Sequence, residues 1–171
     1  MCNHTKMIFI KNCTLLTNLE RVLINTLILS CFQNSRLSTY DTVICYEEGG
    51  DIIGFIGYHT KQHYDIIFGH ITILNQLCVK KTHRSKGIAT DLLKYTEETQ
   101  KNTLILYIDK DEPDTEQLYH FYKRRGYHDI EDIDTQLPIR CHARYNPSIE
   151  YIMIKPYTND KMQKFAKQIS Y

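Results

Sequence analysis

Short apolar runs alternate with stretches of helically spaced apolar residues along this chain of 171 residues. Continuous or alternating apolar runs bounded by polar residues predict strands, and a spacing of three to four residues predicts helices. The predicted order is β-α-(α)-β-β-β-α-β-α-β-β, with the bracketed helix left open, which favours a mixed α/β sheet. The predicted strands are 7–10, 41–46, 52–58, 68–79, 104–108, 127 onward and 150–154, and the helices begin after Thr17, at Thr90 and near Asp114.

Several of these elements carry boundary signals. Thr17-Asn-Leu-Glu20 reads as a capping box, in which the Thr hydroxyl and the Glu carboxylate bond the first free amides of a helix. Glu47-Glu-Gly-Gly50 is a hairpin signature. The last helix has Asp114 or Thr115 as N-cap, runs to Arg125 and stops at Gly126. The first helix carries the apolar residues of one helical face at Leu19, Val22, Leu23 and Leu27, and Cys31 is left open as a further member.

Composition narrows the class of protein. The length suits one domain, and a net charge of +1 argues against a nucleic-acid-binding surface. The run 22–24 is broken by Asn25-Thr26 and is too short for a membrane span, and no secretory signal precedes it. Six cysteines lack paired spacing, so free thiols in a reducing compartment are expected. A cytoplasmic protein is therefore the expectation.

The segment Arg84-Ser-Lys-Gly87-Ile-Ala89 lies between an apolar run, 71–79, and a helix. A glycine turn at this junction presents the free first amides and the positive dipole end of the helix, which together bind anions. Neither the Walker pattern nor the dinucleotide Gly-x-Gly-x-x-Gly pattern occurs here. A pyrophosphate is the expected ligand, and a merely basic turn is the alternative.

Three features carry a resemblance to a known family. The first is 84–89, preceded by Leu77-Cys-Val79, and it fits Arg/Gln-x-x-Gly-x-Gly/Ala. The second is the helix end 118–127, and the third is the closing strand 151–155. Together they resemble the GNAT superfamily of acyl-CoA N-acyltransferases over residues 6–156. The resemblance implies a mixed, mostly antiparallel sheet with a splayed central parallel pair and flanking helices. We assign 1–158 to this domain and 159–171 to a helical tail.

The resemblance also implies a reaction and its residues. Acetyl-CoA would be the co-substrate, and a primary amine would attack it directly in a ternary complex. Tyr122, four residues before Gly126, stands where the family has the tyrosine that protonates the leaving thiolate; a packed core tyrosine is the alternative. Thr115 stands where relatives often have Asn facing the cofactor arm. The residues implied in cofactor binding are Leu77, Cys78, Val79, Arg84, Ser85, Lys86, Gly87, Ile88, Ala89 and Thr115.

The general base stays open. Many relatives have a glutamate where this chain has Asn75, followed by Gln76, and an amide cannot take a proton at neutral pH. His70, Asp109 and the acidic stretch 129–134 are the candidates. No metal is expected: His59 and His63 have the spacing of a helical ligand pair but lie in a connection between strands. Cys141-His142 reads as ordinary loop.

Acidic runs at 47–48, 109–112 and 129–134 are either solvated loops or a rim that attracts cationic amines. The acceptor is left open between a small polyamine-like amine and a protein lysine or N-terminus. Neither a nucleic acid nor a membrane is expected as a partner, and homodimerisation, with the tail packing on a second copy, is left open. The alternative functions are a non-catalytic acyl-CoA-binding module and a nucleotide-binding domain.

Overall fold

The computed structural model describes residues 6–32, 40–62, 70–110, 114–129 and 149–157. The chain forms two compact units. Unit 1 comprises Met1–Lys61 and Thr72–Gln100, and unit 2 comprises Gln62–Ile71 and Lys101–Tyr171. Of the helices in the described ranges, none has the length and hydrophobicity needed to cross a membrane.

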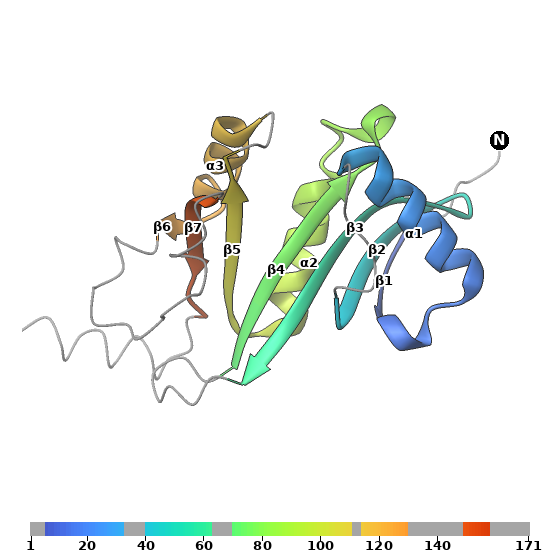
Figure 1. Ribbon diagram of the computed structural model, residues 1–171, viewed down its shortest axis with the longest axis horizontal. Coiled ribbons are helices and arrows are strands. Elements are labelled where there is room, and N and C mark those ends of the chain that lie inside the picture. The colour runs from blue at the N-terminus through green and yellow to red at the C-terminus, as the bar shows by residue number, and fades with distance from the viewer. Residues whose placement is uncertain (1–5, 33–39, 63–69, 111–113, 130–148, 158–171) are drawn as a thin grey trace, which may run out of the picture. The chain divides into compact units, whose positions relative to one another are not determined.

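Unit 1 is built on four strands with a helix on each face (Figure 1). Strands β1 and β3 pair antiparallel with β2, so that Cys45 lies opposite both Phe9 and Phe55. Helix α1 covers one face of these strands and helix α2 covers the other (Figure 1). The elements are β1 (Lys6–Asn12), η1 (Cys13–Leu15), α1 (Asn18–Cys31), β2 (Thr42–Glu48), β3 (Asp51–Gln62), β4 (His70–Val79), η3 (Lys81–His83) and α2 (Ile88–Gln100).

Helix α1 begins as predicted but buries a different face. Thr17 Oγ1 accepts from the Glu20 amide at 3.2 Å, and the Thr17 amide donates to the Glu20 carboxylate at 2.8 Å, which confirms the capping box. Leu27 is buried as predicted, but its buried partners are Ile24 and Ile28. The prediction was wrong for Leu19 and Val22, which are 67% and 61% exposed. The helix carries two apolar stripes, and the register of β2 and β3 selects the one that packs.

The opposite face of unit 1 brings α2 close to β3. A Cβ added at Gly54 would lie 3.0 Å from Ile88 and 3.1 Å from Leu92, so a glycine at this position allows the helix to approach the strand. At the far end of α2, the Gln100 amide donates to the Tyr58 hydroxyl at 2.7 Å. The start of α2, where the predicted anion site lies, is thus held against the sheet by packing of its first buried residues.

Unit 2 contributes the remaining strands and one helix: β5 (Thr103–Asp109), α3 (Thr115–Lys123), β6 (His128–Asp129) and β7 (Ile149–Lys155). Strand β7 pairs antiparallel with β5, Leu106 opposite Met153, and with β6, His128 opposite Ile154. The strand order is β1-β2-β3-β4-β5-β7-β6. A mixed, mostly antiparallel sheet with one parallel pair confirms the predicted fold class. The splay of that pair stays a prediction.

The start of α2 and the end of α3 differ slightly from the sequence prediction. Helix α2 starts at Ile88 instead of Thr90. Helix α3 ends at Lys123 instead of Arg125, and a turn follows in which Gly126 has a φ of +81°. Asp114 is the N-cap residue of α3. The predicted tail 159–171, His63 and the Cys141-His142 pair lie outside the described residues.

Candidate functional site

A tight turn connects β4 to α2. The first helical turn of α2 follows it directly and has backbone amides without acceptors in the helix. Strand β4 ends at Val79, and the Lys80 amide donates to the Ile53 carbonyl at 2.8 Å, which fixes the strand end to β3. The Asp91 amide donates to the Gly87 carbonyl at 3.0 Å. The amides of Ile88 and Ala89 therefore lie in the first turn of α2, where helix geometry provides no acceptor within the helix. We refer to residues 84–89 as the β4–α2 turn.

The backbone of the β4–α2 turn takes conformations that leave space above it. Gly87 has a φ of +85°, and a Cβ added there would meet no atom within 4 Å. Ser85 has a φ of 62°, which is uncommon for a residue with a side chain. An anion can thus approach the main chain at Gly87 without meeting a side chain. The sequence-predicted pyrophosphate group fits this cradle.

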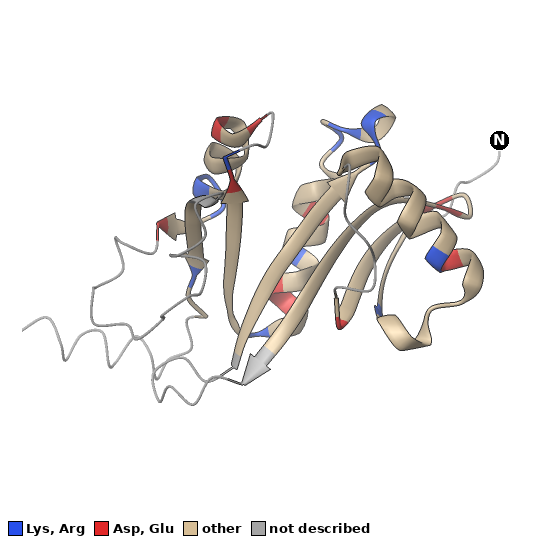
Figure 2. Ribbon diagram, in the orientation of Figure 1, with Lys and Arg blue, Asp and Glu red and all other residues tan. Residues whose placement is uncertain are grey.

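Positive charge surrounds the same turn (Figure 2). Arg84 and Lys86 are exposed. Lys80, by contrast, forms an ion pair with Asp51 at 2.6 Å, and His83 lies 3.9 Å from Glu48. The positive end of the α2 dipole adds to the two exposed side chains. The turn therefore combines backbone donors, space and net positive charge, which are the three properties a phosphate site needs.

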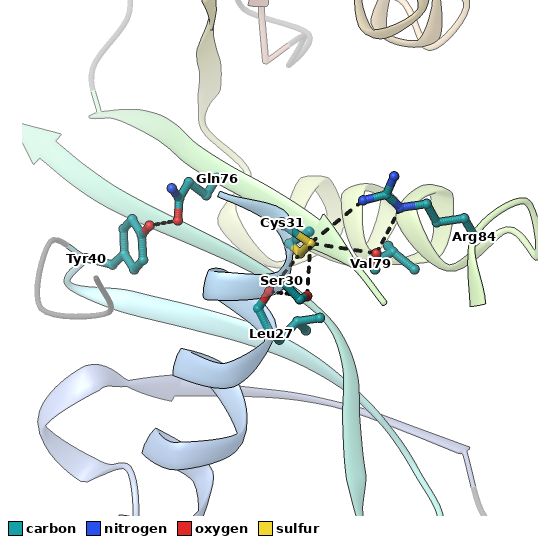
Figure 3. The surroundings of a disulfide bond; sticks show 8 residues. Leu27, Ser30, Cys31, Tyr40, Gln76, Val79 and Arg84 are labelled. Atoms are coloured by element: carbon teal, nitrogen blue, oxygen red, sulfur yellow. Dashed lines mark hydrogen bonds between the residues drawn. A yellow bond between two sulfur atoms is a disulfide. The ribbon is translucent and has the colours of Figure 1, made fainter. Parts of the chain in front are cut away.

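The Arg84 side chain folds back toward the end of β4 (Figure 3). Its Nε donates to the Val79 carbonyl at 3.2 Å, and its Nη2 lies 3.9 Å from the sulfur of Cys31. The arginine thereby connects the turn to the C-terminal end of α1. Sequence reasoning placed Arg84 at the anion but missed Cys31, because 53 residues separate the two and no local pattern joins them.

Cys31 and Cys78 form a disulfide. The expectation of free thiols was therefore wrong for these two residues, and it is confirmed for Cys13 and Cys45, which are free and buried. Cys2 and Cys141 lie outside the described residues. The pair has no sequence signature because the fold, and not a short spacing, brings the end of α1 to the end of β4.

Further along β4, the predicted position of the general base holds amides. Asn75 is exposed, and Gln76 accepts a hydrogen bond from the Tyr40 hydroxyl (Figure 3). A Cβ added at Gly57 would lie 2.7 Å from the Tyr40 ring, so this ring lies directly on β3. Leu77 follows Gln76 and is partly buried. The strand that would bind a thioester is thus held by Tyr40 before Leu77 and by the disulfide at Cys78.

Helix α3 holds the two remaining predicted residues. The Thr115 hydroxyl donates to the Asp109 carbonyl at 3.0 Å, which ties the start of the helix to the end of β5. Tyr122 is 7% exposed. Its ring lies edge-on to Phe121 at 5.2 Å and to Tyr127 at 5.4 Å. We call Phe121, Tyr122 and Tyr127 the aromatic cluster.

Burial changes the acidity of Tyr122. Removal of the phenol from water raises its pKa well above the ordinary value near 10, and the nearby Arg125 opposes this only in part. The hydroxyl therefore stays protonated at any physiological pH. A protonated phenol suits a proton donor, but it equally suits a core tyrosine, so this geometry is compatible with both readings of Tyr122.

The candidates for the base have different surroundings. Asp129 accepts from the Tyr119 hydroxyl at 2.8 Å and from Lys123 at 3.1 Å, so its carboxylate is already paired. Asp109 is exposed at the end of β5. The side chain of His70 and residues 130–134 lie outside what the structure describes. These contacts argue against Asp129 as the general base, because its carboxylate already accepts two hydrogen bonds.

Two further sequence proposals have structural outcomes. Within the acidic runs, Glu48 pairs with Lys6 at 3.7 Å, which favours the reading of ordinary solvated and paired charge there. The Nδ1 atom of His59, on β3, lies 2.9 Å from a carboxylate oxygen of Asp41, the residue before β2. The residues that the structure describes contain no group of three or more His, Cys, Asp or Glu side chains able to hold a metal ion.

The predicted site residues fall into one set in each unit. Unit 1 brings together Leu77, Cys78 and Val79 of β4 with the β4–α2 turn, and adds Cys31, Tyr40 and Gln76, which sequence reasoning did not connect with it. Unit 2 holds Thr115 and Tyr122 on one helix. The roles of these residues stay predictions.

Comparison with known proteins places the chain in a family. The profile of the acetyltransferase (GNAT) domain matches residues 39–129, which is more than half of the chain. No curated protein matches the sequence. Solved structures at 12–16% identity share the fold.

Two of these solved structures illustrate the likeness. Arabidopsis thaliana Naa50, in complex with the bisubstrate analogue CoA-Ac-MVNAL, is 14% identical, with a TM-score of 0.61 over 86% of this chain and 97% of that one. Diaminobutyrate acetyltransferase EctA from Paenibacillus lautus, with its substrate L-2,4-diaminobutyric acid and coenzyme A, is 14% identical. Its TM-score is 0.61 over 92% of this chain and 99% of that one.

Proposed function

Because the chain belongs to the GNAT acetyltransferase family, we propose that it is an acetyl-CoA-dependent N-acetyltransferase that acts on a primary amine by direct attack in a ternary complex. The observation that carries the proposal is the β4–α2 turn, where open space over Gly87 meets helix amides and two exposed cations. When bound, acetyl-CoA supplies a thioester acyl group and a thiolate leaving group. The residues of this chain would bind the cofactor, orient its acyl group and protonate the leaving thiolate.

The first task is to hold the pyrophosphate. The main chain of Gly87, Ile88 and Ala89 would donate to phosphate oxygens, and Arg84 and Lys86 would neutralise part of its charge. At Ser85 the backbone conformation that completes the turn matters more than the identity of the side chain. The donors belong to the backbone, which α2 fixes through buried Ile88, so binding there requires little rearrangement.

The second task is to orient the acyl group. The main chain of Leu77, Cys78 and Val79 would bind the thioester carbonyl and the pantetheine arm. This strand end is held on one side by the Lys80 amide and on the other by the disulfide at Cys78. A strand held in this way presents its amides at constant positions, and preorganised donors are the usual means of stabilising the developing oxyanion.

The third task is proton transfer. The acceptor must lose a proton to attack, and the leaving thiolate must gain one. Tyr122 is the proposed donor, because it stands four residues before Gly126, where the family has the tyrosine that protonates the leaving thiolate. The base is not assigned to a residue: Asn75 and Gln76 cannot fill the role. Deprotonation through water, before or during attack, is consistent with a site that lacks a carboxylate at Asn75.

The acceptor is proposed as a primary amine, in keeping with the neighbours. Naa50 is bound to an analogue that joins CoA to a peptide, and EctA to a small diamino acid. We therefore propose two acceptor classes: a protein N-terminus or lysine, and a small polyamine-like molecule. A panel of such amines, assayed by thiol release from acetyl-CoA, distinguishes them.

Two glycines allow a matched test of the β4–α2 turn as the cofactor site. Gly87 and Gly50 both have a φ of 85°, are exposed, and have no atom within 4 Å of an added Cβ. Gly50 lies in the turn between β2 and β3. Gly87→Glu and Gly50→Glu therefore impose the same backbone strain and the same charge, and they differ only in position.

Gly87→Glu is expected to weaken acetyl-CoA binding by at least about 2 kcal/mol, since it removes charge-assisted hydrogen bonds and adds repulsion. Gly50→Glu is expected to keep the parent affinity. Isothermal titration calorimetry measures both, with circular dichroism to establish folding. Equal affinities in the two variants would remove the turn from the cofactor site.

One observation favours a second candidate function, a non-catalytic acyl-CoA-binding module. The position that carries a glutamate in many relatives is Asn75, so the base is missing from its usual strand. Such a module would bind acetyl-CoA with the same loss in Gly87→Glu but release no thiol with any amine of the panel. Turnover above the uncatalysed rate with one amine excludes it.

A further inference from the structure

A covalent bond joins the end of α1 to the strand that leads into the β4–α2 turn. The disulfide links Cys31 and Cys78, which are 47 residues apart in sequence and have Cα atoms 6.4 Å apart, within the range of native disulfides. Cys31 is the last residue of α1, and Cys78 is the penultimate residue of β4. The proposed transfer reaction uses the main chain of Cys78 but neither of the two cysteine side chains.

The two sulfur atoms differ in accessibility. Cys78 is 2% exposed and belongs to the core beneath α1, together with Leu27 and Phe55. Cys31 is only partly buried, at the end of the helix. A small thiol can therefore reach the bond from the side of Cys31, which is the access that thiol–disulfide exchange requires.

Arg84 connects this bond to the β4–α2 turn (Figure 3). Its Nη2 lies 3.9 Å from the Cys31 sulfur while its Nε donates to the Val79 carbonyl. A neutral sulfur is a weak acceptor, so the oxidised pair leaves the guanidinium available to a phosphate. A thiolate, by contrast, is stabilised by a neighbouring arginine, and it would hold Arg84 away from the turn.

We propose that Cys31 and Cys78 form a thiol redox site that sets the affinity of the β4–α2 turn for the CoA pyrophosphate; this inference rests on the proposed function. The oxidised form fixes the end of α1 against β4, keeps Arg84 available and binds acetyl-CoA more tightly. The reduced form releases the helix end and lets the Cys31 thiolate compete with phosphate for Arg84.

The exchange is balanced with a dithiol as reductant. One thiolate of the dithiol attacks the Cys31 sulfur, the bond to Cys78 breaks, and Cys78 leaves as a thiolate that takes a proton. The second thiol of the reductant then attacks its own mixed disulfide and displaces Cys31. Two electrons pass to the protein, and the dithiol is oxidised to its disulfide. Cys31 partitions between thiol and thiolate, with its proton going to solvent.

The test compares acetyl-CoA binding by the full chain in its two redox states. One sample is oxidised, and the other is reduced with dithiothreitol and desalted without air before calorimetry. Alkylation and peptide mass spectrometry follow the Cys31–Cys78 link. The reduced sample is expected to bind about tenfold more weakly, as for the weakening of one charge-assisted contact. Binding equal within about twofold, or no Cys31–Cys78 link after oxidation, overturns the inference.

Variants separate the link from general effects of reduction. Cys31→Ser can form neither the bond nor a thiolate, so its affinity is expected not to respond to dithiothreitol. Cys13→Ser alters a free cysteine in the same core and should retain the parent response; Cys45→Ala serves if that variant does not fold. A Cys31→Ser protein that still responds contradicts the proposal.

The outcomes also separate the redox inference from the proposed function. Equal binding in the two states overturns the redox inference alone, since the cofactor site would still operate. Absence of acetyl-CoA binding in both states overturns both.

Discussion

The β4–α2 turn and the aromatic cluster of α3 are built on opposite principles. The turn is exposed, carries the two exposed cations Arg84 and Lys86, and offers donors that belong to the main chain. In the cluster Tyr122 and Tyr127 are buried, and the Tyr122 ring contacts the rings of Phe121 and Tyr127. The anion-binding shape of the β4–α2 turn follows from the φ angles of Ser85 and Gly87 and from the residue spacing of the motif. The role of a buried tyrosine depends on what lies beyond its hydroxyl, which its packing does not specify.

The variant Tyr122→Phe tests most strongly whether the buried Tyr122 is a proton donor or only a core residue. The change keeps the ring and removes the proton donor. If Tyr122 protonates the leaving thiolate, kcat is expected to fall about 100- to 10,000-fold, while acetyl-CoA affinity stays the same. Steady-state kinetics and calorimetry measure the two quantities. A variant with at least half the parent turnover would show that the hydroxyl belongs to the core alone.

Tyr127→Ala tests the packing half of the same cluster. Tyr127 is 1% exposed and lies against Tyr122. Removal of a buried aromatic ring typically costs about 3–5 kcal/mol of unfolding free energy, so chemical denaturation should show a large loss of stability. Tyr119→Ala is the control, because Tyr119 lies on α3 and is only partly buried. Similar losses in both would mean that the cluster is not the packing centre of α3.

In the turn, Arg84→Ala is expected to weaken acetyl-CoA binding about tenfold by removing one charge-assisted contact. The free energy of unfolding should change by less than about 1 kcal/mol, because the side chain is exposed and surface substitutions cost little. Lys94→Ala, at an exposed lysine on α2, is the control for a simple change in net charge. A stability loss that exceeds the binding loss would assign Arg84 a structural role.

Thr115→Val gives the smallest expected effect. It removes the hydrogen bond to the Asp109 carbonyl while keeping the shape, so unfolding should become easier by about 1 kcal/mol. Because the hydroxyl already anchors the start of α3, acetyl-CoA affinity is expected to stay within about twofold. A larger loss of affinity, measured by calorimetry, would return Thr115 to the cofactor arm, where the family resemblance places it.

Local signals predicted the elements and the turn well. The capping box at Thr17 and Glu20 and the turn at Gly126 bounded helices because both depend on hydrogen bonds within a few residues. The motif 84–89 predicted a strand–turn–helix junction for the same reason. The helix face was predicted wrongly, because Leu19 and Ile24 both have helical periodicity and only the sheet beneath α1 selects between them.

Local chemistry in the sequence therefore determined which segments form strands and helices, where a glycine turn at Gly87 joins a strand to a helix, and which family the chain resembles. Tertiary structure decided what those elements meet. It paired Cys31 with Cys78, placed Arg84 beside that pair, and engaged Gln76 with Tyr40. The reason is physical: hydrogen bonds in caps and turns close within a few residues. These contacts depend on how a helix packs on a sheet, and that packing is set by the whole core.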